Sequence, residues 1–144
     1  MSDEVLSGDE ALHALKRMFE TGKAEDVTGL LAEDVVLLPP TYGKTWQGRG
    51  LVARLLGFAA EVLGGLRYTA LWHEGDDHVL RFEGMIGSEE ISGVDIVRLD
   101  ADGYVSRFEI FARPPRAVLL LRDAMGERVK ADPQVVAWMG LGPS

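Results

Sequence analysis

The stretch that decides the fold runs from Leu66 to Arg113 and reads LRYTALWHEGDDHVLRFEGMIGSEEISGVDIVRLDADGYVSRFEIFAR. Apolar and polar residues alternate along it in successive runs, and a period of two is typical of β-strands. We expect these strands at 66–74, 78–86, 90–99 and 104–113. Polar connections rich in glycine and aspartate separate them, so consecutive strands pair antiparallel.

Outside this stretch the apolar residues recur mainly at helical spacing. We expect a helix over 8–21, a short second helix over 23–32 and a third over 51–63. The apolar run 35–38, which ends at two prolines, favours a short strand, and 116–129 favours a further helix or near-helix.

This order predicts an α+β fold, in which helices cover one face of a strongly curved antiparallel sheet. Such a sheet with helices at its mouth leaves a cone-shaped interior that commonly holds a small ligand. The length of 144 residues favours a single domain over 1–144, with its core at about 9–128. The tail after Asp132-Pro133 is unusually apolar, so we expect it to dock on its own domain or on a partner.

Composition excludes several classes of site and partner. The chain has no cysteine, which excludes disulfides and thiolate metal sites and fits a cytoplasmic location. The net charge of −8 makes nucleic acid a poor partner. No apolar run approaches the ~18 residues of a membrane span, and the N-terminus does not read as a signal peptide.

Several motifs, in this order and spacing, resemble the NTF2-like superfamily, and specifically SnoaL-like domains. The motifs are Leu30–Val35, Gly48–Gly50, Val79–Gly84, Gly93–Ile96 and Asp102–Val105. The resemblance covers about residues 9 to 128, and implies a cone with a curved antiparallel sheet packed on N-terminal helices. It also implies homodimerisation through the open face of the sheet, where we expect apolar residues such as Leu71, Val94, Ile96 and Phe111.

Asp95 is the first candidate for catalysis, because it interrupts an apolar strand. Alternation places it on one face with Val97 and Leu99, so we expect it to face the interior. Burial disfavours the charged form and raises the pKa of a carboxyl group, which suits a general acid or a base near neutral pH. The alternative is a structural role, in an ion pair with an arginine such as Arg113 or as an acceptor for backbone N–H groups.

His73 is the second catalytic candidate, since histidine transfers protons at neutral pH. By alternation it lies on the face opposite Tyr68 and Trp72. It could equally be a solvated histidine at a strand end. His78 lies just across the turn and could join it at a divalent metal, but nothing fixes such a geometry, and we expect neither metal nor cofactor.

Five aromatic residues are candidates for ligand binding. They are Tyr42, Trp46, Tyr68, Trp72 and Phe108. The last three also fit ordinary core packing. Tyr42 and Trp46 lie in a glycine-rich loop, where a large aromatic is less expected as core filling, so we expect at least one of them at the mouth of the pocket.

Two known chemistries of the fold lack their partner residues here. Ketosteroid isomerases combine a tyrosine and a carboxylic acid in an oxyanion hole with a carboxylate base. The resemblance would place that tyrosine on the helix over 8–21, which has none, and the base near Asp34. Epoxide hydrolases of this fold need an arginine and a second carboxylate where the sequence has Gly93 and Ile110.

SnoaL-type cyclases need mainly a shaped apolar cavity and one acid–base group, which Asp95, with or without His73, could supply. We therefore expect a small-molecule pocket protein with cyclase- or isomerase-like acid–base catalysis on an apolar, ring-containing substrate. The alternative is a non-catalytic domain that binds a ligand or dimerises as an accessory module. The sequence does not decide whether the chain is an enzyme.

Overall fold

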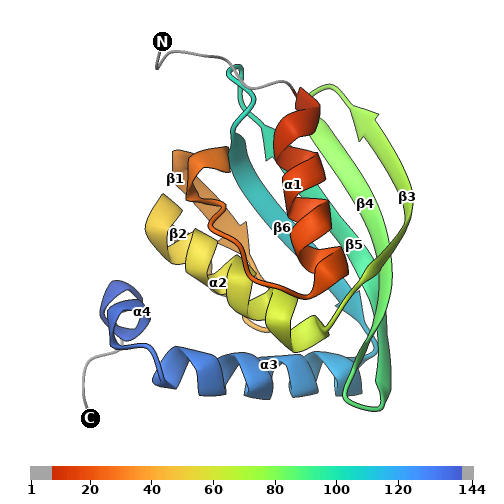
Figure 1. The fold of residues 1–144 in the computed structure, drawn as a ribbon, viewed down its shortest axis with the longest axis vertical. Helices are drawn as coiled ribbons and strands as arrows, with labels where there is room; N and C mark the ends of the chain where they lie inside the picture. The colour runs from red at the N-terminus through yellow and green to blue at the C-terminus, as the bar shows by residue number, and fades with distance from the viewer. Residues whose placement is uncertain (1–7, 141–144) are drawn as a thin grey trace.

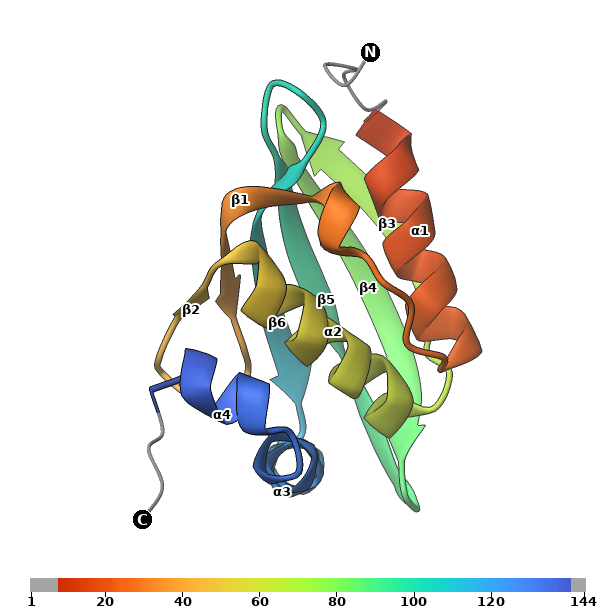
Figure 2. The same ribbon diagram turned by 60° about the vertical axis from the view of Figure 1, so that its left-hand side comes forward.

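The computed structural model describes residues 8–140, and within them a curved six-stranded sheet wraps around two helices (Figure 1). The elements are α1 (Gly8–Thr21), η1 (Thr28–Leu30), β1 (Leu31–Leu38), β2 (Trp46–Gln47), α2 (Arg49–Leu63), β3 (Arg67–Glu74), β4 (Asp77–Ile86), β5 (Glu89–Leu99), β6 (Val105–Arg113), α3 (Pro115–Lys130) and α4 (Pro133–Trp138). Helices α1 and α2 lie on the same face of the sheet, and α3 closes one end (Figure 2). Among these helices, none has the length and apolar character needed to cross a membrane.

The predicted α+β architecture is confirmed, with one difference in the sheet. Strands β3 to β6 form the expected antiparallel meander, and the strand order is β2-β1-β6-β5-β4-β3. However, β1 pairs parallel with β6, so the sheet is mixed. A parallel pair requires a long crossover connection, and here the chain between β1 and β6 supplies it, including α2 and the rest of the meander.

Gly93 allows the backbones of β5 and β6 to lie very close together. A Cβ atom built on this residue would lie only 1.9 Å from the carbonyl oxygen of Phe111 on the neighbouring strand. No side chain fits at that distance, so only glycine permits the backbones to approach in this way.

The predicted second helix over 23–32 is wrong. The structure has only the single turn η1 there, and β1 already begins at Leu31. The side chain of Asp26 accepts hydrogen bonds from the backbone N–H and the hydroxyl of Thr28, which competes with helix formation. An irregularity in the pairing of β1 with β6 leaves Glu33 and Asp34 exposed, and this breaks the strand alternation that would have identified β1.

Strand β3 contains a β-bulge that the alternation pattern did not reveal. Tyr68 pairs with Phe82 and Ala70 pairs with Arg81, so β3 has one more residue than β4 at this point. The extra residue is Thr69. A bulge of this kind shifts every later residue of the strand to the opposite face of the sheet.

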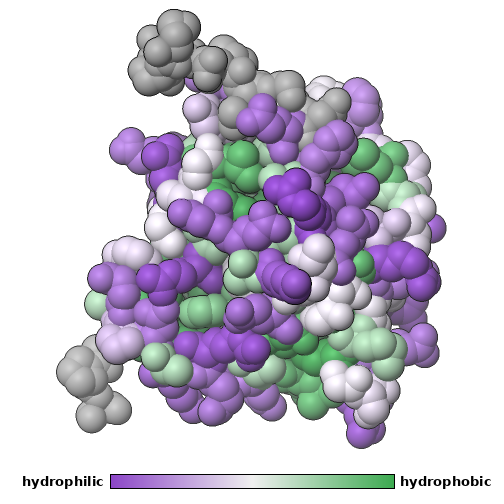
Figure 3. Space-filling model, viewed as in Figure 1, coloured by the Kyte–Doolittle hydropathy of each residue, from purple (hydrophilic) through white to green (hydrophobic). Residues whose placement is uncertain are grey.

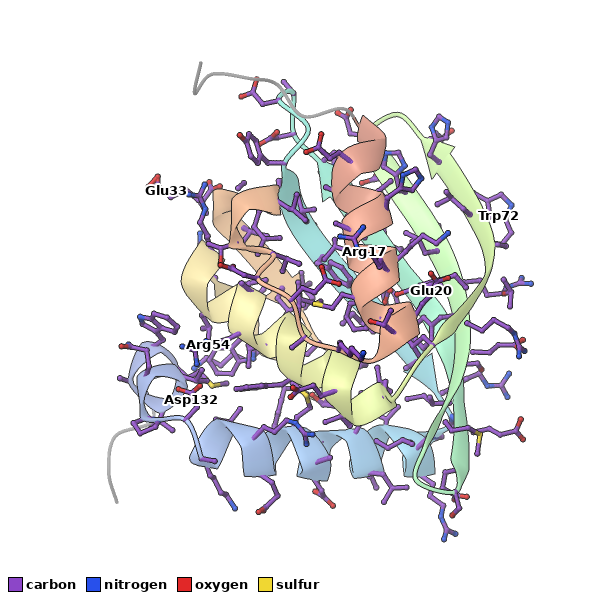
Figure 4. The ribbon with its side chains drawn as sticks, in the orientation of Figure 1. Arg17, Glu20, Glu33, Arg54, Trp72 and Asp132 are labelled. Carbon is purple, nitrogen blue, oxygen red and sulfur yellow. The ribbon has the colours of Figure 1, made fainter. Side chains whose placement is uncertain are left out.

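The bulge corrects three expectations for β3. His73 pairs with His78 on the same face as Tyr68, not on the opposite one. Trp72 pairs with Val79 and points away from the helices (Figure 4), so it is not on the pocket face. Leu71 pairs with Leu80 and therefore does not belong to the open face of the sheet, where we expected it.

The core lies between the sheet and helices α1 and α2. The apolar residues of α1 at helical spacing are buried, namely Leu12, Leu15, Met18 and Phe19. Phe19 packs against Phe108 of β6 with ring centroids 6.5 Å apart. Phe108 is fully buried in this contact and does not line the pocket, so its predicted place at the ligand is wrong. Ordinary core packing, the alternative for this residue, describes it.

The apolar tail packs back on the chain as α4. Val135 is completely buried, and the side chain of Asp132 caps the helix by accepting the N–H of Val135 at 3.1 Å. Arg54 of α2 forms an ion pair with Asp132 (Figure 4) and lies 6.0 Å from the ring centroid of Trp138. Arg54 therefore contacts both the N-cap and the last residue of α4.

Candidate functional site

A cavity of about 430 Å³ lies between the sheet, α2, α3 and the loop after β1. Its wall is almost entirely apolar, and apolar surface is visible between α2 and α3 (Figure 3). Residues that form its inner wall include Leu37, Leu55, Leu56, Ala59, Leu63, Leu66, Phe82, Ile91, Ile110 and Ala112. Its volume is in the usual range for sites that hold a small molecule.

Asp95 lies in this wall, as predicted, with only 4% of its surface exposed. Asp95 of β5 pairs with Leu80 and Ile110 on the two neighbouring strands and shares their face of the sheet, which is the face that the helices cover. Burial raises the pKa of its carboxyl group to about 8, and a hydrogen bond from Tyr68 offsets a smaller part of this rise. At pH 7 the group is therefore mostly a neutral carboxylic acid.

The ion pair between Asp95 and Arg113 is not formed. Among residues 8–140, Tyr68 provides the only side-chain hydrogen bond to Asp95, and no cation pairs with it. Arg113 of β6 pairs with Ser92 of β5. Ser92 lies three positions before Asp95 on the same strand, so Ser92 and its partner Arg113 lie on the face of the sheet opposite to Asp95. Without a cation nearby, nothing counteracts the cost of ionising the buried carboxyl group.

Tyr68 reaches Asp95 from β3, two strands away. Its hydroxyl donates to Oδ2 of Asp95 at 3.4 Å, and the centroid of its partly exposed ring lies 5.9 Å from Nζ of Lys16 on α1. Burial raises the pKa of the Tyr68 hydroxyl well above its usual value, and the nearby Asp95 adds to this effect. The hydroxyl therefore stays protonated. Tyr68 contacts the site through Asp95 rather than by lining the cavity.

Tyr42 and Trp46 both line the cavity, in agreement with the prediction for the glycine-rich loop. Tyr42 is 52% exposed and so lies at the mouth. Trp46, which forms part of the short strand β2, is half-buried and carries the ammonium group of Lys44 4.7 Å from its ring centroid.

His73 does not join Asp95. It stacks on His78 with ring centroids 5.4 Å apart, near the turn between β3 and β4. From the pairing register, with strands about 4.8 Å apart and a rise of about 3.3 Å per residue, its Cα atom lies about 12 Å from that of Asp95. That separation excludes direct proton transfer between them. Within the described part of the chain, no group of three or more side chains could hold a metal ion.

Trp72 lies outside the pocket as well. It is 49% exposed on the far face of the sheet, where its ring lies 5.3 Å from the guanidinium carbon of Arg81. Of the seven residues proposed from the sequence, the cavity wall contains Asp95, Tyr42 and Trp46, and Tyr68 joins through its hydrogen bond.

Sequence reasoning missed the part of the wall that comes from the C-terminal third of the chain. Leu121, Met125 and Val129 of α3 line the cavity, and Met139 after α4 reaches it as well. The first three have helical spacing, which predicts a buried face but not the cavity that this face meets. Two lysines at the rim, Lys44 and Lys130, were not singled out either.

A curved sheet, helices on its inner face and one buried acid in an apolar cavity define a class of α+β pocket proteins. Solved structures share the fold of this chain. It is similar to a bacterial protein with a cystatin-like fold from Silicibacter pomeroyi, with 36% identity over 91% of this chain and 93% of that one and a TM-score of 0.85. The chain has the fold of NTF2-like and ketosteroid isomerase-like proteins.

Two further structures are similar over most of their length. A steroid delta-isomerase from Pseudomonas aeruginosa has 25% identity over 86% of this chain and 92% of that one, with a TM-score of 0.80. A hypothetical protein with a ketosteroid isomerase-like fold from Catenulispora acidiphila, solved in complex with trimethylamine, has 14% identity over 76% of this chain and 89% of that one. Its TM-score is 0.60, and it shows the fold alone. No protein-family model and no curated protein matches the sequence.

Proposed function

We propose that the protein binds an apolar, ring-containing small molecule in the cavity and that Asp95 transfers a proton to or from it, as in SnoaL-type and isomerase-like enzymes. One observation carries this proposal. A carboxyl group with a pKa of about 8 forms part of the wall of an otherwise apolar cavity, and no cation neutralises it among the described residues. Such a group is costly to bury, and groups of this kind cluster at functional sites.

The hydrogen bond from Tyr68 supports a directed role for Asp95. Because Tyr68 occupies Oδ2, the other carboxyl oxygen remains for a ligand. A neutral carboxylic acid is a hydrogen-bond donor as well as an acceptor. It can therefore bind the carbonyl or hydroxyl oxygen of a ring compound and stabilise negative charge that develops there.

The arrangement differs from the pairing of acid and base in ketosteroid isomerases. Tyr68 is on β3, and α1 carries no tyrosine. Asp34, the available position for a separate base, is exposed on β1 and does not line the cavity. Asp95 would then serve as both acid and base, and a pKa close to neutral pH suits a group that accepts a proton and returns it.

The test is a ligand-detected NMR screen of ring ketones and phenols, followed by turnover assays on the hits. Ala59→Trp fills the cavity and should abolish binding, whereas Ala101→Trp, in the exposed turn between β5 and β6, should not. Asp95→Asn should keep binding and reduce turnover by about a hundredfold or more. Unchanged turnover in Asp95→Asn would reject the acid–base role.

A non-catalytic binding domain is the second candidate, and one observation favours it. Apart from Asp95, the titratable side chains of the wall are Tyr42, Lys44 and Lys130, which are all exposed at the mouth. A sensor or carrier needs no second buried acid or base. Hits that bind the cavity without turnover in the wild type would establish this alternative.

We also propose a homodimer that forms through the open face of the sheet. Val94 pairs with Phe111 on this face, Ile96 is next to them, and Phe111 is 50% exposed. The exposed Trp72 replaces Leu71 in the expected set, as the bulge in β3 requires. Sedimentation equilibrium should give twice the chain mass for the wild type and the single mass for Phe111→Glu. A monomeric wild type would overturn this proposal.

A further inference from the structure

Two lysines stand at the mouth of the cavity. Lys44 comes from the loop between β1 and β2, and Lys130 is the last residue of α3. They are two of the four lysines in the chain, and both line the cavity. The mouth is therefore flanked by positive charge from two elements that are far apart in the sequence.

This charge contrasts with the rest of the protein. The chain carries 23 acidic and 15 basic residues, yet Asp95 is the only acidic residue among those that line the cavity. Since Asp95 is buried, the charged side chains that line the mouth are both lysines. An acidic protein with a locally basic entrance attracts anions to that entrance and repels them elsewhere.

Contacts at the rim keep one of the lysines in place. The ammonium group of Lys44 lies 4.7 Å from the ring centroid of Trp46, which itself lines the cavity. A cation–π contact of this kind holds the charge next to the mouth. Lys130 has Glu127 as a neighbour at 3.8 Å, but both side chains are about 80% exposed, and such pairs are weak. Lys130 therefore remains available to an anion.

We infer that the ligand is an amphipathic anion, with an apolar ring body in the cavity, an oxygen at Asp95 and an acidic group such as a carboxylate held between Lys44 and Lys130. This inference rests on the proposed function and adds the charge of the ligand. The distribution of polar groups along the cavity supports this inference. Most of the wall is apolar, a neutral acid lies inside it, and the cations lie only at the rim.

Two fluorescent probes that differ in one group provide the experiment. 8-Anilinonaphthalene-1-sulfonate and N-phenyl-1-naphthylamine share the same rings, and only the first carries an anionic group. Their dissociation constants are measured for the wild type, Lys44→Gln, Lys130→Gln and the double variant, with Lys23→Gln as the control. Lys23 is exposed and does not line the cavity.

Each single substitution should weaken binding of the sulfonate about two- to fivefold and the double variant about tenfold, with the uncharged probe unchanged. Raising the salt concentration from about 20 mM to about 500 mM should weaken only the sulfonate. Lys23→Gln should bind both probes like the wild type.

The outcomes separate the two proposals. In one outcome both probes bind the wild type and Ala59→Trp blocks both, but the lysine variants change the binding of the two probes equally or change neither. This outcome rejects the anionic ligand and leaves the proposed pocket in place. If neither probe binds, or if Ala59→Trp leaves binding unchanged, the proposed pocket function fails and this inference fails with it.

Discussion

The hydroxyl of Tyr68 on β3 donates a hydrogen bond to Oδ2 of Asp95 on β5 across 3.4 Å, with β4 between the two strands. The bond connects a partly exposed residue to a fully enclosed one. It stabilises the charged form of Asp95, and its effect on the pKa is therefore opposite to that of burial.

Tyr68→Phe should raise the pKa of Asp95 further above its value of about 8 in the wild type, because the variant loses the hydrogen bond and keeps the burial. The carboxyl ¹³C chemical shift of Asp95, followed against pH by NMR, measures this pKa. Tyr42→Phe is the control, since its hydroxyl lies at the exposed mouth. An unchanged or lower pKa in Tyr68→Phe would show that the hydrogen bond does not act on Asp95.

Asp95→Asn should be more stable than the wild type at high pH. The unfolded chain ionises Asp95 near pH 3.8 and the folded chain near pH 8, so wild-type stability decreases as the pH rises through this window. The difference should be small below pH 4 and should reach on the order of 5 kcal/mol above pH 8. Urea unfolding at several pH values measures it.

Asp77→Asn is the matched control for this series. The hydrogen bond from Arg98 lowers the pKa of Asp77, so its contribution is present above the unfolded-state pKa and is lost as the pH falls. The two substitutions should therefore shift stability in opposite directions at neutral pH. A difference between Asp95→Asn and the wild type that does not vary with pH would contradict the raised pKa.

Gly93→Ala should destabilise the fold by about 3 kcal/mol or more, because the added methyl group would collide with the carbonyl oxygen of Phe111. Gly29→Ala should change stability by about 0.5 kcal/mol or less, since its position has no atom within 4 Å. Thermal and urea unfolding compare the two. Equal stability of both variants would mean that β5 and β6 do not need this close approach.

Arg54→Ala should loosen α4, because Arg54 contacts both Asp132 and Trp138. We expect a stability loss of about 1 kcal/mol and faster hydrogen exchange at the amides of 133–138. Arg17→Ala is the control, since it removes an exposed pair with Glu25 far from α4. Exchange rates that rise equally in both variants would contradict a specific role for Arg54.

The sequence predicted the elements with regular periods and failed where the chain adds a residue. The helix at 8–21 and the strands of the meander followed from their repeats of 3.6 and 2 residues. The bulge at Thr69 is invisible to a period of two, and it misplaced Trp72 and His73. The irregular pairing of β1 with β6 likewise hid the start of this strand, so the helix predicted over 23–32 overlapped it.

The candidate site was only partly predictable for a similar reason. Asp95 was found because a carboxylate interrupts an apolar strand, which is a local signal. The hydrogen bond from Tyr68 on β3 to Asp95 on β5 crosses β4 and depends on the register, while Met125 and Met139 reach the cavity through the placement of α3 and α4. No local pattern in the sequence contains such long-range geometry.

The docking of α4 has a practical consequence for handling the protein. Met139 lies in the cavity wall only a few residues before the end of the chain, and Val135 is completely buried. A chain shortened at Lys130 would therefore lose Met139 from the cavity wall and alter the compartment whose contents are to be identified. Ligand searches should therefore use a chain that keeps α4 and Met139.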